Sequence, residues 1–186
     1  MSTRRASDII ADWPEESRQA AQLVLDKYGE PQETTASYLL WASPGPWARM
    51  VAAKSFDPHS FPAPHNDSVQ SVIRYRVPPE KVGALAQFDG SVVVDRTQGE
   101  VSARCHDEEA NNLALNLMHD IVTGVRSVED ARRYYGQEFL DYRRGKPTPY
   151  MDQLRVPADD DAADPDERIL SDADLEKAVA EGEREQ

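Results

Sequence analysis

The side chains with the clearest chemical potential lie in a proline-rich segment. His59, His65 and Asp67 fall within nine residues, and three prolines lie within or beside them. Imidazole and carboxylate groups are ligands that zinc, iron and manganese accept. Prolines restrict the backbone, so such a segment would lose little conformational entropy on presenting ligands. The pattern predicts a divalent-metal site, although the spacing His-x5-His-x-Asp is not diagnostic of one metal or one enzyme class.

A structural interpretation of the same segment stays open. Asp67 would then turn the chain by hydrogen-bonding nearby backbone groups, as Asp side chains do in turns. His59 and His65 would be exposed loop residues. We expect residues 56–67 to form a rigid loop without regular structure, because its prolines disfavour helix and strand interiors.

A helix predicted over residues 107–123 supplies the second group of candidates. Asp107 is the expected N-cap and Gly124 the expected stop. Most of this helix is apolar, but a narrow stripe holds Asn112, Asn116 and His119. Asn and His are weak helix formers for a solvent face, which favours a polar pocket wall or a buried hydrogen-bond network.

Two roles follow for this stripe if it faces the proline-rich segment across a pocket. Asn112 and Asn116 would orient a bound ligand, and His119 would join His59 and His65 as a metal ligand or act as a general base. In the structural alternative, the amides satisfy backbone groups of the proline-rich segment.

An aromatic pair and the single cysteine complete the candidates. Trp41 and Trp47 flank a Pro-Gly turn, where they would form a platform for a ligand or peptide, or else belong to the core. Cys105 alternates with apolar residues of a predicted strand and precedes a cluster of acids. We therefore interpret Cys105 as a small buried hydrophobe rather than a nucleophile.

The predicted elements indicate one α+β domain over residues 1–156. No pair of strands requires a parallel crossover, so we expect a two-layer arrangement: an antiparallel sheet of about five strands with helices packed on one face. The expected strands are 38–41, 47–51, 69–77, 91–97 and 100–105, and the expected helices begin near residues 14, 79, 107 and 127.

Most of the acidity lies at the end of the chain. Residues 157–186 hold 12 acidic and three basic side chains, a net charge of −9 out of −13 for the whole chain. We expect a mostly disordered acidic tail, with a possible short helix over about 171–181. A chain without a basic field is not expected to bind nucleic acid. No apolar run is long enough to predict a membrane span, and we expect a cytoplasmic protein.

The sequence leaves two main hypotheses for function. Dinucleotide, P-loop, zincin and nucleophile-elbow motifs are absent, which favours a small acidic binding or adaptor protein that meets a protein partner or another copy of itself. The alternative is a metal-dependent enzyme or metal-binding protein whose His/Asp site faces helix 107–123. A metal-free small-molecule site in the same pocket is a third possibility.

Overall fold

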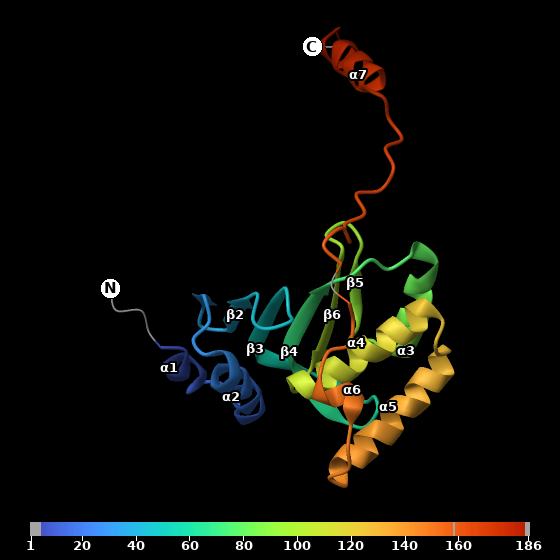
Figure 1. Cartoon of the computed structure of the whole chain (residues 1–186). Helices are drawn as coiled ribbons and strands as arrows, with labels where there is room; N and C mark the ends of the chain where they lie inside the picture. The colour runs from blue at the N-terminus through green and yellow to red at the C-terminus, as the bar shows by residue number, and fades with distance from the viewer. Residues whose placement is uncertain (1–4, 158, 185–186) are drawn as a thin grey trace.

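The structure is a computed structural model that describes residues 5–157 and 159–184. Within these residues, six antiparallel strands form one sheet in the order β1-β2-β3-β4-β6-β5 (Figure 1). The strands are β1 (Glu33–Thr34), β2 (Tyr38–Ala42), β3 (Arg49–His59), β4 (His65–Arg74), β5 (Val93–Asp95) and β6 (Glu100–Cys105). The predicted α+β class with an antiparallel sheet is confirmed, and the additional strand is the two-residue β1.

Helices that pack with the sheet form the second layer, and the last helix, α7 (Asp172–Arg184), lies apart from it (Figure 1). The other helices are α1 (Ala6–Ile10), α2 (Glu15–Tyr28), the short 3-10 helix η1 (Pro79–Lys81), α3 (Val82–Phe88), α4 (Glu108–Thr123), α5 (Val128–Arg143) and α6 (Pro149–Asp152). Helix α2 packs on β3 and β4, and α4 packs on β4 and β6. Helices α3, α5 and α6 pack against α4. No helix in the described part of the chain is long and apolar enough to cross a membrane.

Helix α4 is the central element of the helical layer. The Asp107 side chain accepts a hydrogen bond from the Ala110 amide at 2.8 Å, and Gly124 ends the helix with a φ of 78°. The sequence predicted both features: a carboxylate that caps the N-terminus and a glycine, here in the left-handed conformation, that ends the helix. Because β6 ends at Cys105, the N-terminus of α4 lies directly beside the end of that strand.

The proline-rich segment is a β-hairpin, not the predicted loop. Strand β3 continues to His59 and β4 begins at His65, so only residues 60–64 remain irregular. Beyond Ala53, β3 has no pairing with β2. Pro58 is tolerated there because the unpaired side of the strand needs no N–H donor.

The first part of the acidic segment contacts the body of the protein. The Arg96 guanidinium donates to Asp164 at 2.6 Å and to Asp166 at 2.8 Å, and Ala162 is buried against the body. Gly99, with a φ of 68°, leaves no room for a side chain beside the Ala162 backbone. Residues 161–166 therefore lie on the turn between β5 and β6.

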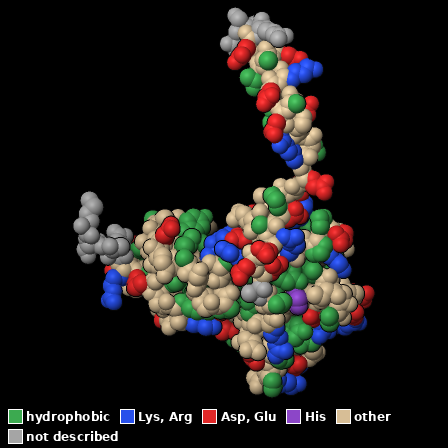
Figure 2. Space-filling view, turned by 45° about the horizontal axis from the view of Figure 1, so that its top comes forward, with side chains coloured by type: hydrophobic (Ala, Val, Ile, Leu, Met, Phe, Trp, Pro, Cys, Tyr) green, Lys and Arg blue, Asp and Glu red, His purple; other side chains and the backbone are tan. Residues whose placement is uncertain are grey.

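Helix α7 follows and projects away from the body (Figure 1). Figure 2 shows acidic side chains along this terminal segment with a few hydrophobic ones between them. The predicted helix is present, and the Ser171 hydroxyl accepts from the Asp174 amide at 3.2 Å, as an N-cap does.

Candidate metal centre

Five chemically capable side chains meet where three strand ends and one helix N-terminus come together. His59 ends β3, His65 and Asp67 begin β4, Cys105 ends β6, and His106 precedes the cap of α4. Strand register produces this meeting, because His59 pairs with His65 and Val69 pairs with Cys105. We call these five residues the histidine cluster.

The first ligand set in the cluster consists of His59, His65 and Asp67. The Nδ1 atom of His59 lies 3.1 Å from Asp67 Oδ2, and Nε2 of His65 lies 3.0 Å from Asp67 Oδ1. One ligand atom from each residue lies within 4.8 Å of the others. Ligand atoms about 2.0–2.1 Å from one tetrahedral zinc ion are separated by roughly 3.4 Å, so only small adjustments would bring the three onto one ion.

Two atoms of this set lack hydrogen-bond partners. His59 Nδ1 and Asp67 Oδ1 are buried, and among the residues that the structure describes neither has a neighbour in hydrogen-bond geometry. Buried polar atoms are almost always paired, so two unpaired atoms in one group of metal-ligating side chains require an explanation. A metal ion between them would satisfy both.

The other nitrogen of each imidazole faces an acceptor. Nδ1 of His65 donates to the Ala63 carbonyl at 2.7 Å, which leaves Nε2 as the lone-pair nitrogen of the neutral ring. Nε2 of His59 lies 3.6 Å from Asp89 Oδ1, and Asp89 is buried. Metal-binding histidines are usually oriented in this way, with the second nitrogen held by a carbonyl or a carboxylate.

Cys105 and His106 lie on the other side of His65. The Cys105 Sγ atom is 3.3 Å from His65 Nε2 and 3.4 Å from His106 Nδ1. His106 Nε2 in turn lies 2.9 Å from Asp107 Oδ2. The thiol thus lies between two imidazole nitrogens, and it is buried below the surface of the protein.

The charges around the cluster set its protonation. The Asp67 carboxylate, 3.0 Å from Nε2, raises the pKa of His65, outweighing the effect of partial burial. Burial, together with the Asp67 and Asp107 charges, raises the pKa of the Cys105 thiol well above its usual value. Without a cation, Cys105 is thus a neutral thiol, which agrees with its predicted lack of nucleophilic character.

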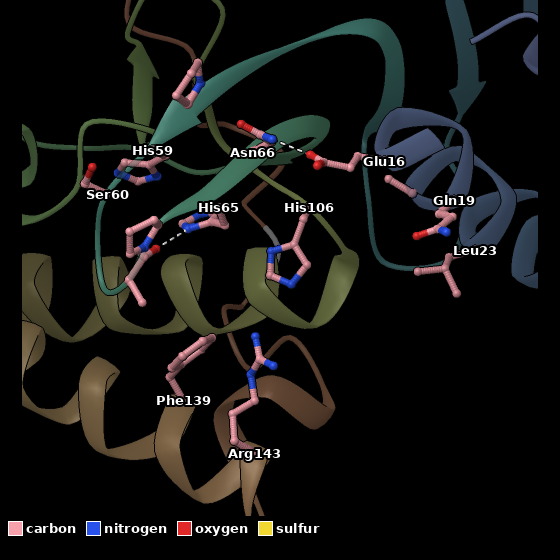
Figure 3. Close-up of a pocket in the computed structure, with 14 residues that line it drawn as sticks. Glu16, Gln19, Leu23, His59, Ser60, His65, Asn66, His106, Phe139 and Arg143 are labelled. Carbon is pink, nitrogen blue, oxygen red and sulfur yellow. Dashed lines mark hydrogen bonds between the residues drawn. The ribbon is translucent and has the colours of Figure 1, made fainter. Parts of the chain in front are cut away.

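A pocket of about 650 Å³ opens over the cluster (Figure 3). Three of its lining residues are His59, His65 and His106, which lie side by side at its base. Its walls come from α2 and α5, which contribute both polar and apolar side chains, namely Glu16, Gln19, Leu23, Phe139 and Arg143. A ligand of small-molecule size would reach the imidazole groups through this opening.

The structure does not bring His119 to this pocket. Its Nδ1 atom is 2.8 Å from the Tyr75 hydroxyl, and the two rings meet edge to face. His119 lies twelve residues beyond Asp107, which is roughly 18 Å along the axis of α4. The predicted fourth ligand therefore belongs to a different part of the fold.

The amide stripe faces the segment around α6, not the proline-rich segment. Asn112 donates to the Met151 carbonyl at 2.9 Å, and Asn116 donates to the carbonyls of Tyr150 and Gln153, both at 2.9 Å. The Asn116 oxygen also accepts from the Arg155 amide at 2.7 Å. These amides hold an irregular segment of the chain in place, although the Asn112 oxygen is buried without a partner among the described residues.

The two tryptophans that were candidates for a ligand platform lie in the core. Trp41 is 1% exposed and donates to the Gly29 carbonyl at 2.8 Å. Trp47 is 2% exposed and donates to Glu108 at 2.9 Å. Rings this deeply buried offer almost no free face, so the structure assigns them the core role that the sequence left as the alternative.

Sequence reasoning missed three members of the site: His106, Asp89, and Cys105 in its position as a neighbour of His65. The Cys-His pair directly before a helix cap was a visible signal. The pairing of β4 with β6 was not, because these strands are not consecutive in the chain.

Comparison with known proteins gives no family for this chain. No protein-family model matches it, and no curated protein or solved structure does so either. A function must therefore be inferred from the chemistry of the histidine cluster.

Proposed function

We propose that this protein is a zinc-dependent enzyme that hydrolyses a small molecule, with the ion held by His59, His65 and Asp67. One observation carries the proposal. Three ligand atoms lie within 4.8 Å of one another, and two of them are buried without hydrogen-bond partners among the described residues. With His65 neutral and no metal ion, these two atoms have no protein partner in the described part of the chain, at a cost of about 1–3 kcal/mol each.

The chemistry of the neighbours favours zinc over iron. Two imidazoles and a carboxylate suit either metal. However, the Cys105 thiol is 3.3 Å from His65 Nε2, where an oxygen-activating iron would expose it to oxidation. Zinc does not change its oxidation state and tolerates a neighbouring thiol.

The open pocket favours a catalytic rather than a structural site. Structural zinc sites are closed by four protein ligands, whereas catalytic sites keep one position for water or substrate. The imidazoles of the first set line the 650 Å³ pocket, so that position would face the opening. When bound there, zinc supplies Lewis acidity and activates water for attack on an ester or amide.

Arg143 indicates the class of substrate. Its side chain extends from α5 into the pocket (Figure 3), and it forms no ion pair within the part of the chain that the structure describes. The guanidinium lies over the Phe139 ring, 5.2 Å from its centroid, and a pocket guanidinium without an acidic partner is suited to a carboxylate or phosphate group. The substrate that fits best is a small hydrolysable molecule that carries one such anionic group.

Zinc content tests this proposal. Protein incubated with zinc and then freed of excess metal should retain one ion per chain. His65→Ala should retain none, because only His59 and Asp67 would remain to hold the ion. His119→Ala is the matched control: it removes a histidine outside the site and should retain the ion. Wild-type protein that retains no zinc, or His65→Ala protein that retains one ion, would contradict the proposal.

The adaptor function predicted from the sequence is a second candidate, and one observation favours it. Helix α7 exposes Leu175 and Val179, at 48% and 63%, and no other element covers them. Light scattering of the full chain and of a chain ending at Glu167 tests it. Association that is lost on truncation supports an adaptor role for α7, whereas a monomeric mass for each of the two chains contradicts self-association.

A further inference from the structure

Cys105, His106 and His65 form a second group of ligand atoms beside the first. Sγ of Cys105 is 3.3 Å from His65 Nε2 and 3.4 Å from His106 Nδ1, and one atom from each residue lies within 4.8 Å of the others. This group differs from the first in having a sulfur atom and no carboxylate. It shares one atom with the first group, Nε2 of His65.

The hydrogen atoms available to this second group do not satisfy it. His65 donates its Nδ1 hydrogen to the Ala63 carbonyl. His106 donates its Nε2 hydrogen to the Asp107 carboxylate, 2.9 Å away. Each neutral ring then directs a lone pair at Cys105, whose thiol has one hydrogen. One of the two nitrogens is left without a donor, whereas a single cation in place of that hydrogen would contact all three atoms.

We propose that His65, Cys105 and His106 form a second metal-binding set that takes a soft, thiophilic ion such as copper(I). Thiolate and imidazole ligands select soft ions, and a trigonal arrangement of two histidines and one cysteine is a known copper geometry. The sulfur–nitrogen distances of 3.3 and 3.4 Å lie within a few tenths of an ångström of the roughly 3.7 Å separation expected around a trigonal ion with bonds of 2.0 Å to nitrogen and 2.3 Å to sulfur. Binding breaks the S–H bond, forms the metal–sulfur bond and releases the proton to solvent.

The shared nitrogen makes the two sets mutually exclusive. Nε2 of His65 has one lone pair, so it binds one ion at a time. A soft ion in the second set would take His65 away from His59 and Asp67 and thereby release the zinc ion. In this respect the inference rests on the proposed function, because it names a regulator of that same site.

The soft ion has a route to the second set. His106 is partly exposed and lines the same pocket as His65, so an ion entering the pocket meets these two imidazoles above the buried thiol. No rearrangement of α4 is required, because Asp107 already holds both the His106 ring and the helix N-terminus.

Cadmium is the probe that tests the second set without any substitution. A thiolate bound to cadmium absorbs in the ultraviolet by charge transfer, and the chain has a single cysteine, so the band reports Cys105 alone. Titration of metal-free, reduced protein should give a band that saturates at one cadmium per chain. Addition of cadmium to the zinc-loaded protein should release one zinc as the band appears. Absence of the band, or a band with the zinc retained, overturns the proposal.

Variants separate the second set from the first. His106→Ala and Cys105→Ser should weaken cadmium binding by more than about 100-fold, since loss of a direct ligand should exceed the 10–100-fold effect of an outer-shell partner. Both should retain zinc, and zinc loss in Cys105→Ser would show one merged site and overturn the proposal. His59→Ala and Asp67→Asn should lose zinc and keep the band. If wild-type protein binds no zinc yet gives a band that depends on His65 and His106, the proposed function fails and the second set stands.

Discussion

Two regions of the molecule place polar side chains against an apolar core, with different results. Along α4, the amides of Asn112 and Asn116 donate to backbone carbonyls of an irregular segment. At the N-terminus of that helix, the histidine cluster leaves His59 Nδ1 and Asp67 Oδ1 without partners among the described residues and faces a pocket. One amide atom, Asn112 Oδ1, is also buried without a partner among the described residues. The histidine cluster differs from the amides because it combines unpaired atoms with metal-ligating side chains and an open pocket.

The largest expected effect is the response of stability to zinc. At a free zinc concentration 1,000 times its Kd, binding should raise the free energy of unfolding of the wild type by about 4 kcal/mol. Asp67→Asn should show no such increment, whereas Asn112→Ala should show all of it. Denaturant unfolding with zinc or with chelator measures both. Equal increments in Asp67→Asn and the wild type would remove the distinction between the amides of α4 and the histidine cluster.

The next effect concerns the amides of α4 alone. Asn116→Ala loses three hydrogen bonds to residues 150–155, and we expect a destabilisation of about 2–3 kcal/mol because each bond contributes roughly 1 kcal/mol. Zinc stoichiometry should not change. Gln137→Ala, which removes an exposed helical amide, is the control and should stay within about 0.5 kcal/mol. A stable Asn116→Ala that loses zinc would show that the amides do belong to the site.

Much of this comparison was accessible from the sequence, for physical reasons. Asp107 and Gly124 gave the bounds of α4, because caps act through local backbone geometry. The spacing of His59, His65 and Asp67 brought them together because a hairpin joins their strands. The contacts that the amides and the histidine cluster make across the fold were not accessible from the sequence. The Asn112 contact with Met151 and the Cys105 contact with His65 both join residues about 40 positions apart, and no local signal sets such pairings.

A smaller effect, with opposite signs in the two metal states, follows from His65. Its pKa is raised by the neighbouring Asp67 carboxylate, so in chelator its contribution to stability is full below the unfolded pKa of about 6.5 and is lost as the pH rises through the folded pKa. The free energy of unfolding should therefore fall between about pH 6 and pH 8. With zinc it should rise over the same range, because zinc requires the neutral ring.

The control for this pH effect is His65→Ala, which should lose both slopes, whereas His119→Ala should keep both. The same sign of slope with and without zinc in the wild type would show that the ion does not bind through His65. Urea unfolding at fixed zinc activity, repeated at several pH values, gives the comparison.

The smallest expected effect is that of the acidic helix on the site. A chain ending at Glu167 keeps the Arg96 contacts with Asp164 and Asp166 but lacks α7. Its free energy of unfolding should stay within about 0.5 kcal/mol of the full chain, because α7 is exposed along its length. Its zinc stoichiometry should also be unchanged. Loss of zinc on truncation would connect α7 to the histidine cluster and contradict the separation described here.

The most direct measurement is a crystal structure of the zinc-loaded protein with anomalous scattering recorded on both sides of the zinc absorption edge. We expect one strong peak at the base of the pocket, about 2.0–2.2 Å from His59 Nδ1, His65 Nε2 and an Asp67 oxygen, with a non-protein ligand on the pocket side. A peak at Tyr75 and His119, a peak on the acidic segment alone, or hydrogen-bonded imidazoles with no peak between them would contradict a metal centre in this cluster.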